Sequence, residues 1–110
     1  YQAKVYFESN QGGEYIKHAI KTVSPISVTG IPSTKGKEQR AMAPLGLYEM
    51  GFVHHCFEFV DMESEMVSWN PFDTKMKSPN RMDALVGALN VLAKKGVMGV
   101  KRTNRLRKVA

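Results

Sequence analysis

The sequence is poor in the features that mark secreted, membrane-spanning and disulfide-stabilised proteins. Its 110 residues include one cysteine, Cys56, so no disulfide can form within the chain, which fits a reducing intracellular environment. No run of about 18 apolar residues is present, which excludes a membrane-spanning helix of ordinary length. No basic and then apolar segment at the start indicates export. We therefore expect a soluble cytoplasmic protein without a membrane partner.

Acidic residues are absent from residues 94–110, the basic tail. The tail holds seven of the 16 lysines and arginines, and the body, residues 1–93, holds the other nine against all 10 aspartates and glutamates. A basic tail beside a nearly neutral body favours contact with a polyanion such as DNA, because neutralised phosphates release counterions. The alternative is a solvated, unstructured terminus, which is common for such charge runs.

The pattern of apolar and turn-forming residues predicts one compact α/β domain. Strands are predicted over 4–8, 26–31 and 52–57, where β-branched and aromatic residues lie between turn residues. Apolar residues at offsets of three and four predict helices over 15–23, 38–50 and 61–69, with irregular first turns in the second because of Pro44. Strands that alternate with helices indicate a sheet with parallel neighbours.

The segment from Ser78 onward predicts the start of the last helix. Ser78 is a suitable N-cap, and Pro79 suits the first helical position, where its missing N–H is not needed. Asp83 lies in the first turns, where the simplest explanation is attraction to the positive end of the helix dipole, worth about 0.3–1 kcal/mol. It flanks an apolar stripe that faces a core, formed by Met82, Leu85, Val86, Leu89, Leu92 and Ala93.

Three motifs, in order along residues 4–93, resemble one protein family. They are VYFESNQGG at 5–13, GKEQRA at 36–41 with LYEMGFVHH at 47–55, and SPNRMDALVGAL at 78–89. They are similar to the E-x-N-x-G-G strand, the K-x-x-R-A and G-x-V-x-H stretch and the SPDRxDALVWAL helix in the nuclease domain of the tailed-phage terminase large subunit. Two positions depart from the family pattern: Asn80 replaces Asp and Gly87 replaces Trp.

The resemblance implies an RNase H-like fold, here partial, with a central sheet flanked by helices and an acidic residue on the C-terminal helix. Glu8 and Asp83 match two of the family's catalytic and metal-binding carboxylates, which suit a site with two Mg²⁺ or Mn²⁺ ions. The family's first catalytic Asp would lie upstream of Tyr1, as would its ATPase motor. Because the chain does not begin with Met, we expect a fragment. Because the fragment lacks the first catalytic Asp, we expect it to be a poor nuclease by itself.

The implied activity is the cutting of concatemeric double-stranded DNA during phage genome packaging in the host bacterial cytoplasm. The portal protein and the small terminase subunit are the implied protein partners. The alternative is a non-catalytic module that docks on DNA or on the portal. The absence of upstream strands would also leave a sheet edge open to self-association.

Residues expected to contact DNA lie at helix starts and in the basic tail. N–H groups at a helix N-terminus can hold a phosphate, and basic side chains attract it. The alternatives are an ordinary turn before a helix and pairing with acidic neighbours. The expected DNA contacts are Asn10, Gly12, Gly13, Lys37, Arg40, Arg81, Lys101, Arg102 and Arg105.

Other patterns are excluded or predicted to be structural. Lys35 occupies the second glycine position of a phosphate-binding loop, so no ATP site is expected. His54, His55 and Cys56 are consecutive, and on a strand they would point to alternate faces and could not bind one zinc ion. The acidic residues that we expect to form solvated faces are Glu49, Glu58, Asp61, Glu63 and Glu65.

Overall fold

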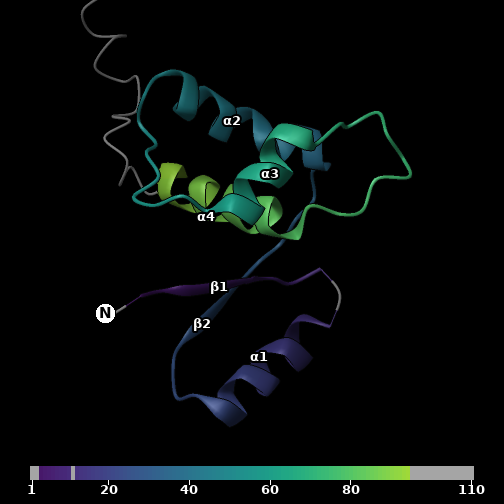
Figure 1. Ribbon diagram of the computed structural model, residues 1–110. Helices are drawn as coiled ribbons and strands as arrows, with labels where there is room; N and C mark the ends of the chain where they lie inside the picture. The colour runs from purple at the N-terminus through teal and green to yellow at the C-terminus, as the bar shows by residue number, and fades with distance from the viewer. Residues whose placement is uncertain (1–2, 11, 95–110) are drawn as a thin grey trace, which may run out of the picture. The chain divides into compact units, whose positions relative to one another are not determined.

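The computed structural model describes residues 3–10 and 12–94, whose order along the chain is shown in Figure 1. They form a mixed α/β structure with four helices and one two-stranded parallel sheet. The sequence predicts one compact domain, whereas the structure groups the residues in two compact units, the first ending at Gly36 and the second beginning at Lys37. Within the described residues, no helix is long and apolar enough to cross a membrane.

The first unit is a β-α-β unit. Strands β1 (Val5–Glu8) and β2 (Val28–Ile31) are parallel, and helix α1 (Gly13–Val23) joins them. Such a crossover is needed because a tight turn cannot return the chain in the same direction. The register places Glu8 opposite Ile31 at the carboxyl end of the pair. The three elements confirm the prediction from the sequence, although β2 begins at residue 28 rather than 26.

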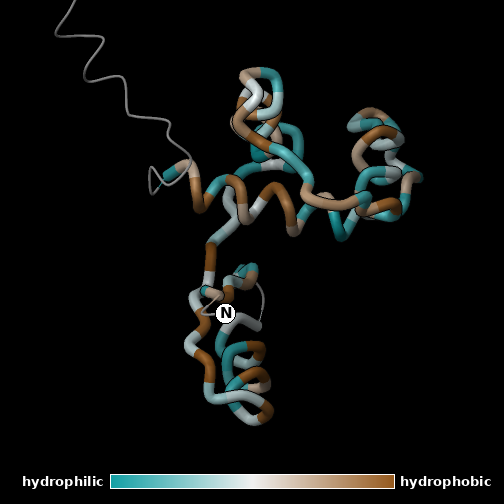
Figure 2. The backbone as a smooth tube through the Cα atoms, turned by 60° about the vertical axis from the view of Figure 1, so that its left-hand side comes forward, coloured by the Kyte–Doolittle hydropathy of each residue, from teal (hydrophilic) through white to brown (hydrophobic). Residues whose placement is uncertain are grey.

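Helix α1 begins after a glycine turn and is amphipathic. Gly12 has a φ of 64°, a left-handed conformation that glycine adopts readily, and its carbonyl accepts the hydrogen bond of the Ile16 N–H. Ile16 and Ile20 are half-buried, whereas Tyr15 and Val23 are exposed. Apolar and polar segments alternate along the helix in Figure 2. One side of α1 therefore packs on the strands that it contacts.

The second unit is built from three helices, and α4 (Asn80–Lys94) contacts both of the others. Helices α2 (Lys37–Glu49) and α3 (Val60–Ser68) each pack against α4. The stripe predicted on the last helix is buried at Met82 and Leu89 and half-buried at Leu85 and Val86, while Leu92 is 36% exposed. The core of this unit is formed by the buried helical residues Pro44, Leu47, Met82 and Leu89.

Helix α2 continues through Pro44, although the sequence predicts irregular first turns. Pro44 has no N–H, so the carbonyl of Arg40, four residues earlier, has no helical donor. The side-chain amide of Asn90 on α4 donates to this carbonyl instead, with an Nδ2–O distance of 2.9 Å. A hydrogen bond between two helices thus replaces the bond that the proline removes.

Helix α2 ends in a glycine turn. Gly51 has a φ of 75°, and its N–H bonds to the Tyr48 carbonyl at 3.0 Å. The N–H of Phe52 bonds to the Leu47 carbonyl, also at 3.0 Å. Together these bonds form a Schellman motif, which satisfies carbonyls that a helix end leaves without partners. The prediction that the helix stops at Gly51 is confirmed.

The strand predicted over 52–57 is wrong, because this segment connects α2 to α3 without strand pairing. The His54 imidazole bonds to the Gly51 carbonyl at 2.9 Å, and the His55 imidazole contacts Tyr48 and Glu63. A strand needs a neighbour for its backbone N–H and carbonyl groups. The two strands of the described chain pair with each other, so the segment is held by side chains instead.

Candidate functional site

Asp83, a predicted metal ligand, lies in the first turn of α4 beside a lysine and a serine. Lys37 Nζ lies 2.9 Å from Asp83 Oδ2 and 2.5 Å from Ser78 Oγ. Ser78 Oγ donates a hydrogen bond to the same Asp83 oxygen at 3.3 Å. The side chains of Lys37 and Asp83 are 38% and 26% exposed. We call these three residues the Asp83 cluster, which brings together the second and third sequence motifs.

The Asp83 carboxylate has one oxygen that is not used in these contacts. Both Lys37 and Ser78 contact Oδ2, and Oδ1 makes no hydrogen bond with the described residues. An ionised carboxylate has about four acceptor positions on its two oxygens. Mg²⁺ and Mn²⁺ prefer oxygen ligands of this kind. The contacts of the cluster therefore leave the acceptor positions of Oδ1 unused among the described residues.

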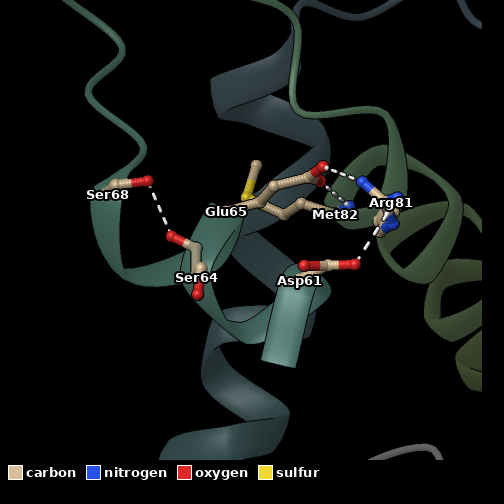
Figure 3. A network of polar contacts seen from close by, with 6 residues as sticks. All are labelled: Asp61, Ser64, Glu65, Ser68, Arg81 and Met82. Atoms are coloured by element: carbon tan, nitrogen blue, oxygen red, sulfur yellow. Dashed lines mark hydrogen bonds and ion pairs between the residues drawn. The ribbon is translucent and has the colours of Figure 1, made fainter. Parts of the chain in front are cut away.

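A glutamate from α3 holds the N-terminal turn of α4 (Figure 3). Glu65 Oε2 accepts a hydrogen bond from the Met82 N–H at 2.9 Å, and Oε1 lies 3.2 Å from Arg81 Nη1. Asp61 is 3.7 Å from Arg81 Nη2. The Met82 hydrogen bond, followed by the contacts with Arg81, holds the pKa of Glu65 below its ordinary value, although burial acts in the opposite direction. Glu65 thus satisfies an N–H that a helix start leaves open.

Ser78 is not the side-chain N-cap that the sequence predicts. Its hydroxyl contacts Asp83 and Lys37 rather than a backbone N–H. The Pro79 carbonyl accepts the hydrogen bond of the Asp83 N–H at 2.9 Å, so the helix begins one residue later than predicted. Because Glu65 caps the turn from another helix, the serine hydroxyl is available to the charged pair.

Glu8, the other predicted metal ligand, is the exposed last residue of β1. It makes no hydrogen bond or ion pair with any other residue that the structure describes. The loops that follow the two strands are tied together by Asn10, whose Oδ1 accepts the Ser33 N–H at 2.7 Å and whose Nδ2 donates to the Ser33 carbonyl. Glu8 therefore stands at the carboxyl edge of the sheet beside a fixed loop, with its carboxylate open to a ligand.

The two predicted metal ligands lie in different units, Glu8 in the first and Asp83 in the second. Their approach to one another therefore stays a prediction. Among residues 3–10 and 12–94, no group of three or more His, Cys, Asp or Glu side chains is arranged to hold a metal ion. The donor chemistry fits Mg²⁺ or Mn²⁺, because these ions accept a few carboxylate oxygens and retain several waters.

In the first unit, the predicted DNA contacts are already part of the local structure. Both ends of the Asn10 amide are used by Ser33. Gly12 forms the left-handed turn before α1, and a Cβ on Gly13 would lie 3.1 Å from the Cβ of Ser9. These residues shape the turn between β1 and α1, which was the alternative to a phosphate contact.

In the second unit, two predicted DNA contacts are paired with acids. Lys37 is paired with Asp83, and Arg81, which is 60% exposed, is paired with Glu65 and Asp61. The Nε atom of Arg40 is buried and has no hydrogen-bond partner among the described residues. The predicted tail contacts lie outside the described residues: Lys101, Arg102 and Arg105.

Two glutamates that the sequence assigns to solvated faces have specific partners. One is Glu65, described above, and the other is Glu63, whose Oε1 lies 2.8 Å from His55 Nδ1. The other ring nitrogen, Nε2, lies 2.7 Å from the Tyr48 hydroxyl. Burial, with a smaller contribution from the charge of Glu63, raises the pKa of Tyr48. No periodic pattern links these residues, because their contacts cross a turn or join two helices.

Comparison of the chain with protein-family models, with curated proteins and with solved structures finds no match. The chemistry of the Asp83 cluster and of Glu8, together with the three sequence motifs, therefore carries the functional interpretation.

Proposed function

We propose that this chain is the C-terminal part of the nuclease domain of a tailed-phage terminase large subunit, a metal-dependent endonuclease for double-stranded DNA. The observation that carries the proposal is the 2.9 Å contact between Lys37 and Asp83. It joins the second and third motifs at the carboxylate that the resemblance assigns to metal binding. A residue that only interacts with its helix dipole needs no such partner.

The first unit supports the same proposal through the position of Glu8. An RNase H-like site places acidic residues at strand ends, and Glu8 ends a strand whose parallel neighbour follows by a helical crossover. Its carboxylate has no competing partner among the described residues. The proposal also assigns both units to a single RNase H-like fold.

In this proposal, Glu8 and Asp83 would hold Mg²⁺ or Mn²⁺, and the bound ion would supply Lewis-acid chemistry for phosphodiester hydrolysis. Lys37 neutralises Asp83 and supplies a cation beside the site that can also contact a DNA phosphate. The family site uses a further Asp, so we expect weak cleavage by residues 1–110 alone. The portal protein and the small terminase subunit are the proposed partners.

The proposal is tested first by metal binding. Addition of MnCl₂ to the 110-residue chain should broaden the NMR signals of Glu8 and Asp83, because bound Mn²⁺ is paramagnetic. Asp83→Asn should remove the broadening at α4, while Asp73→Asn should preserve it. Asp73 is a matched control because its Oδ1 accepts the Lys75 N–H, which an asparagine oxygen can also do. If Mn²⁺ broadens the signals of neither Glu8 nor Asp83, the result would contradict the metal site.

The second test is cleavage of supercoiled plasmid by a chain extended upstream through the expected acidic strand. Nicking should require Mg²⁺ or Mn²⁺ and should be lost in Asp83→Asn but not in Asp73→Asn. The basic tail favours the competing proposal, a non-catalytic DNA-binding or portal-docking module. DNA binding without metal-dependent nicking would support that module and contradict the endonuclease.

A further inference from the structure

Polar contacts connect the three helices of the second unit in a closed circuit. The circuit leaves α2 near its end at Tyr48 and passes through His55 to Glu63 on α3. Glu65 on α3 accepts a hydrogen bond from the Met82 N–H in the N-terminal turn of α4. Asp83 in the same turn pairs with Lys37 at the start of α2. This polar circuit consists, in order, of Lys37, Tyr48, His55, Glu63, Glu65, Met82 and Asp83.

His55 is the member of the polar circuit that lies between helices, and its ring is held on several sides. The carboxylate of Glu63 only accepts, so Nδ1 carries the hydrogen of that bond, and Nε2 shares a second hydrogen bond with the Tyr48 hydroxyl. The ring also packs edge-on against Tyr48 and Phe59, with centroid separations of 5.7 and 6.0 Å. Its side chain is 18% exposed. The imidazole is therefore fixed in one orientation.

Helix α3 depends on these polar contacts because it has no fully buried residue of its own. It packs against α4, and the hydrogen bonds of Glu63 and Glu65 fix it at two points along its length. When one partner of a shielded hydrogen bond is lost, the other group is left unsatisfied at a considerable cost. Removal of His55 would leave the half-buried Tyr48 hydroxyl in that state, would leave the 37% exposed Glu63 carboxylate to water, and would release the first of the two points.

We propose that His55 is a positioning residue for the Asp83 cluster. It sets the place of α3, and α3 in turn sets, through Glu65 and Met82, the helix turn that carries Asp83. The assignment of Asp83 as a metal ligand rests on the proposed function. The link from His55 to the turn of α4 stands on the contacts alone.

The Met82 N–H provides a direct readout of this link. An N–H in the first turn of a helix has no internal partner and normally exchanges quickly with water. Here it is bonded to Glu65, so its hydrogen-exchange protection reports the position of α3 relative to α4. In His55→Ala we expect this protection to fall about tenfold, as for the loss of one shielded hydrogen bond.

Two further variants separate positioning from general stability. Asparagine places its amide nitrogen near the position of His55 Nδ1 and can donate to Glu63, whereas glutamine reaches the position of Nε2. We expect His55→Asn to restore Met82 protection and His55→Gln to leave it low, because the effect passes through Glu63. His54→Ala is the control, since His54 is exposed and, among the described residues, its ring bonds only to the nearby Gly51 carbonyl.

Each outcome decides a separate point. Unchanged Met82 protection in His55→Ala, or an equal loss in His54→Ala, would overturn the positioning role. If His55→Ala does not fold, equal protection in the Asn and Gln variants overturns it instead. If Met82 responds as expected but Mn²⁺ never broadens the Asp83 signal in the parent chain, the link stands and the proposed metal function fails.

Discussion

The two units of this chain are stabilised in different ways. The first is stabilised by backbone hydrogen bonds between parallel strands and by the contact of Asn10 with Ser33, and among its described residues one apolar side chain, Val28, is buried. In the second, buried helix residues are enclosed by side-chain hydrogen bonds from one helix to another. The register of the strands therefore positions Glu8, whereas side-chain hydrogen bonds between helices position Asp83.

The strongest test of this contrast removes a core side chain from α4. Leu89 is 5% exposed, and Leu89→Ala should lower the free energy of unfolding by about 2–5 kcal/mol, because a cavity remains where the side chain was. Urea denaturation gives the loss, and hydrogen exchange should place it in the second unit. Leu92→Ala, on the same helix at 36% exposure, should cost clearly less. Equal losses would contradict the core assigned to this unit.

A substitution in the first unit should act on the sheet instead. A Cβ on Gly30 would lie 2.9 Å from the Cβ of Ser9 and 3.3 Å from Cζ of Phe7, so Gly30→Ala should cost about 1–3 kcal/mol. Hydrogen exchange should rise in β1 and β2. Gly36→Ala serves as the control, since nothing lies within 4 Å of that Cβ. If the larger effect occurred in α2 to α4, the separation of the two units would be wrong.

The hydrogen bond from Asn90 to the Arg40 carbonyl should be worth about 1–3 kcal/mol, because Asn90→Ala leaves that carbonyl without a donor. Pro44→Ala supplies a backbone N–H that can bond to the same carbonyl. We therefore expect Asn90→Ala to cost less when it is combined with Pro44→Ala. A double-mutant cycle from denaturation curves measures the difference. Strict additivity would show that the two groups do not share the carbonyl.

The second unit should also be the more sensitive to acid. The folded-state pKa of Glu65 is lowered, so its charge stabilises the folded state fully at pH values above the ordinary glutamate pKa of 4.5. This contribution is lost as the pH falls through the lowered value. The difference in unfolding free energy between the parent chain and Glu65→Gln should therefore shrink between about pH 7 and about pH 3. A difference that stays constant over this range would exclude the expected charge effect.

The smallest effect on stability is expected for the ion pair itself. Lys37→Gln should change the unfolding free energy by only about 0–1 kcal/mol, because partly exposed ion pairs contribute little. The same substitution should strengthen Mn²⁺ binding at Asp83, since the ion no longer competes with an ammonium group. We expect this change in the free energy of binding to be larger than the change in the free energy of unfolding. NMR titration tests this against Lys35→Gln, an exposed neighbour. Weaker Mn²⁺ binding in Lys37→Gln would instead indicate that Lys37 shapes the site.

Elements with local signals could be predicted from the sequence. The first strand, the helix before Pro25 and the stop at Gly51 follow from residues within a few positions of each other. The segment 52–57 has the composition of a strand, but its backbone has no strand to pair with in the described chain. Composition cannot show whether a neighbour exists, and this is why that prediction failed.

The candidate site was predictable in part. The place of Asp83 in the first turn of a helix follows from the local pattern around Ser78, and so does the strand-end position of Glu8. The partner of Asp83, the cap from Glu65 and the bond from Asn90 depend on which helices lie side by side. These contacts span long stretches of sequence, and no local pattern encodes them. The metal-binding role of Glu8 and Asp83 stays a prediction.

The spacing of the contacts in the second unit implies an order of folding. The hydrogen bonds of His55 join residues seven and eight positions apart, whereas those that join Ser78 and Asn90 to α2 span 41 and 50 positions. Short loops close faster and at a lower entropic cost than long ones. We therefore expect α2, the turn at Gly51 and α3 to assemble first, and α4 to dock afterwards. Asp83 would then reach its place in the last step of folding, so the candidate site and the completed unit would form together.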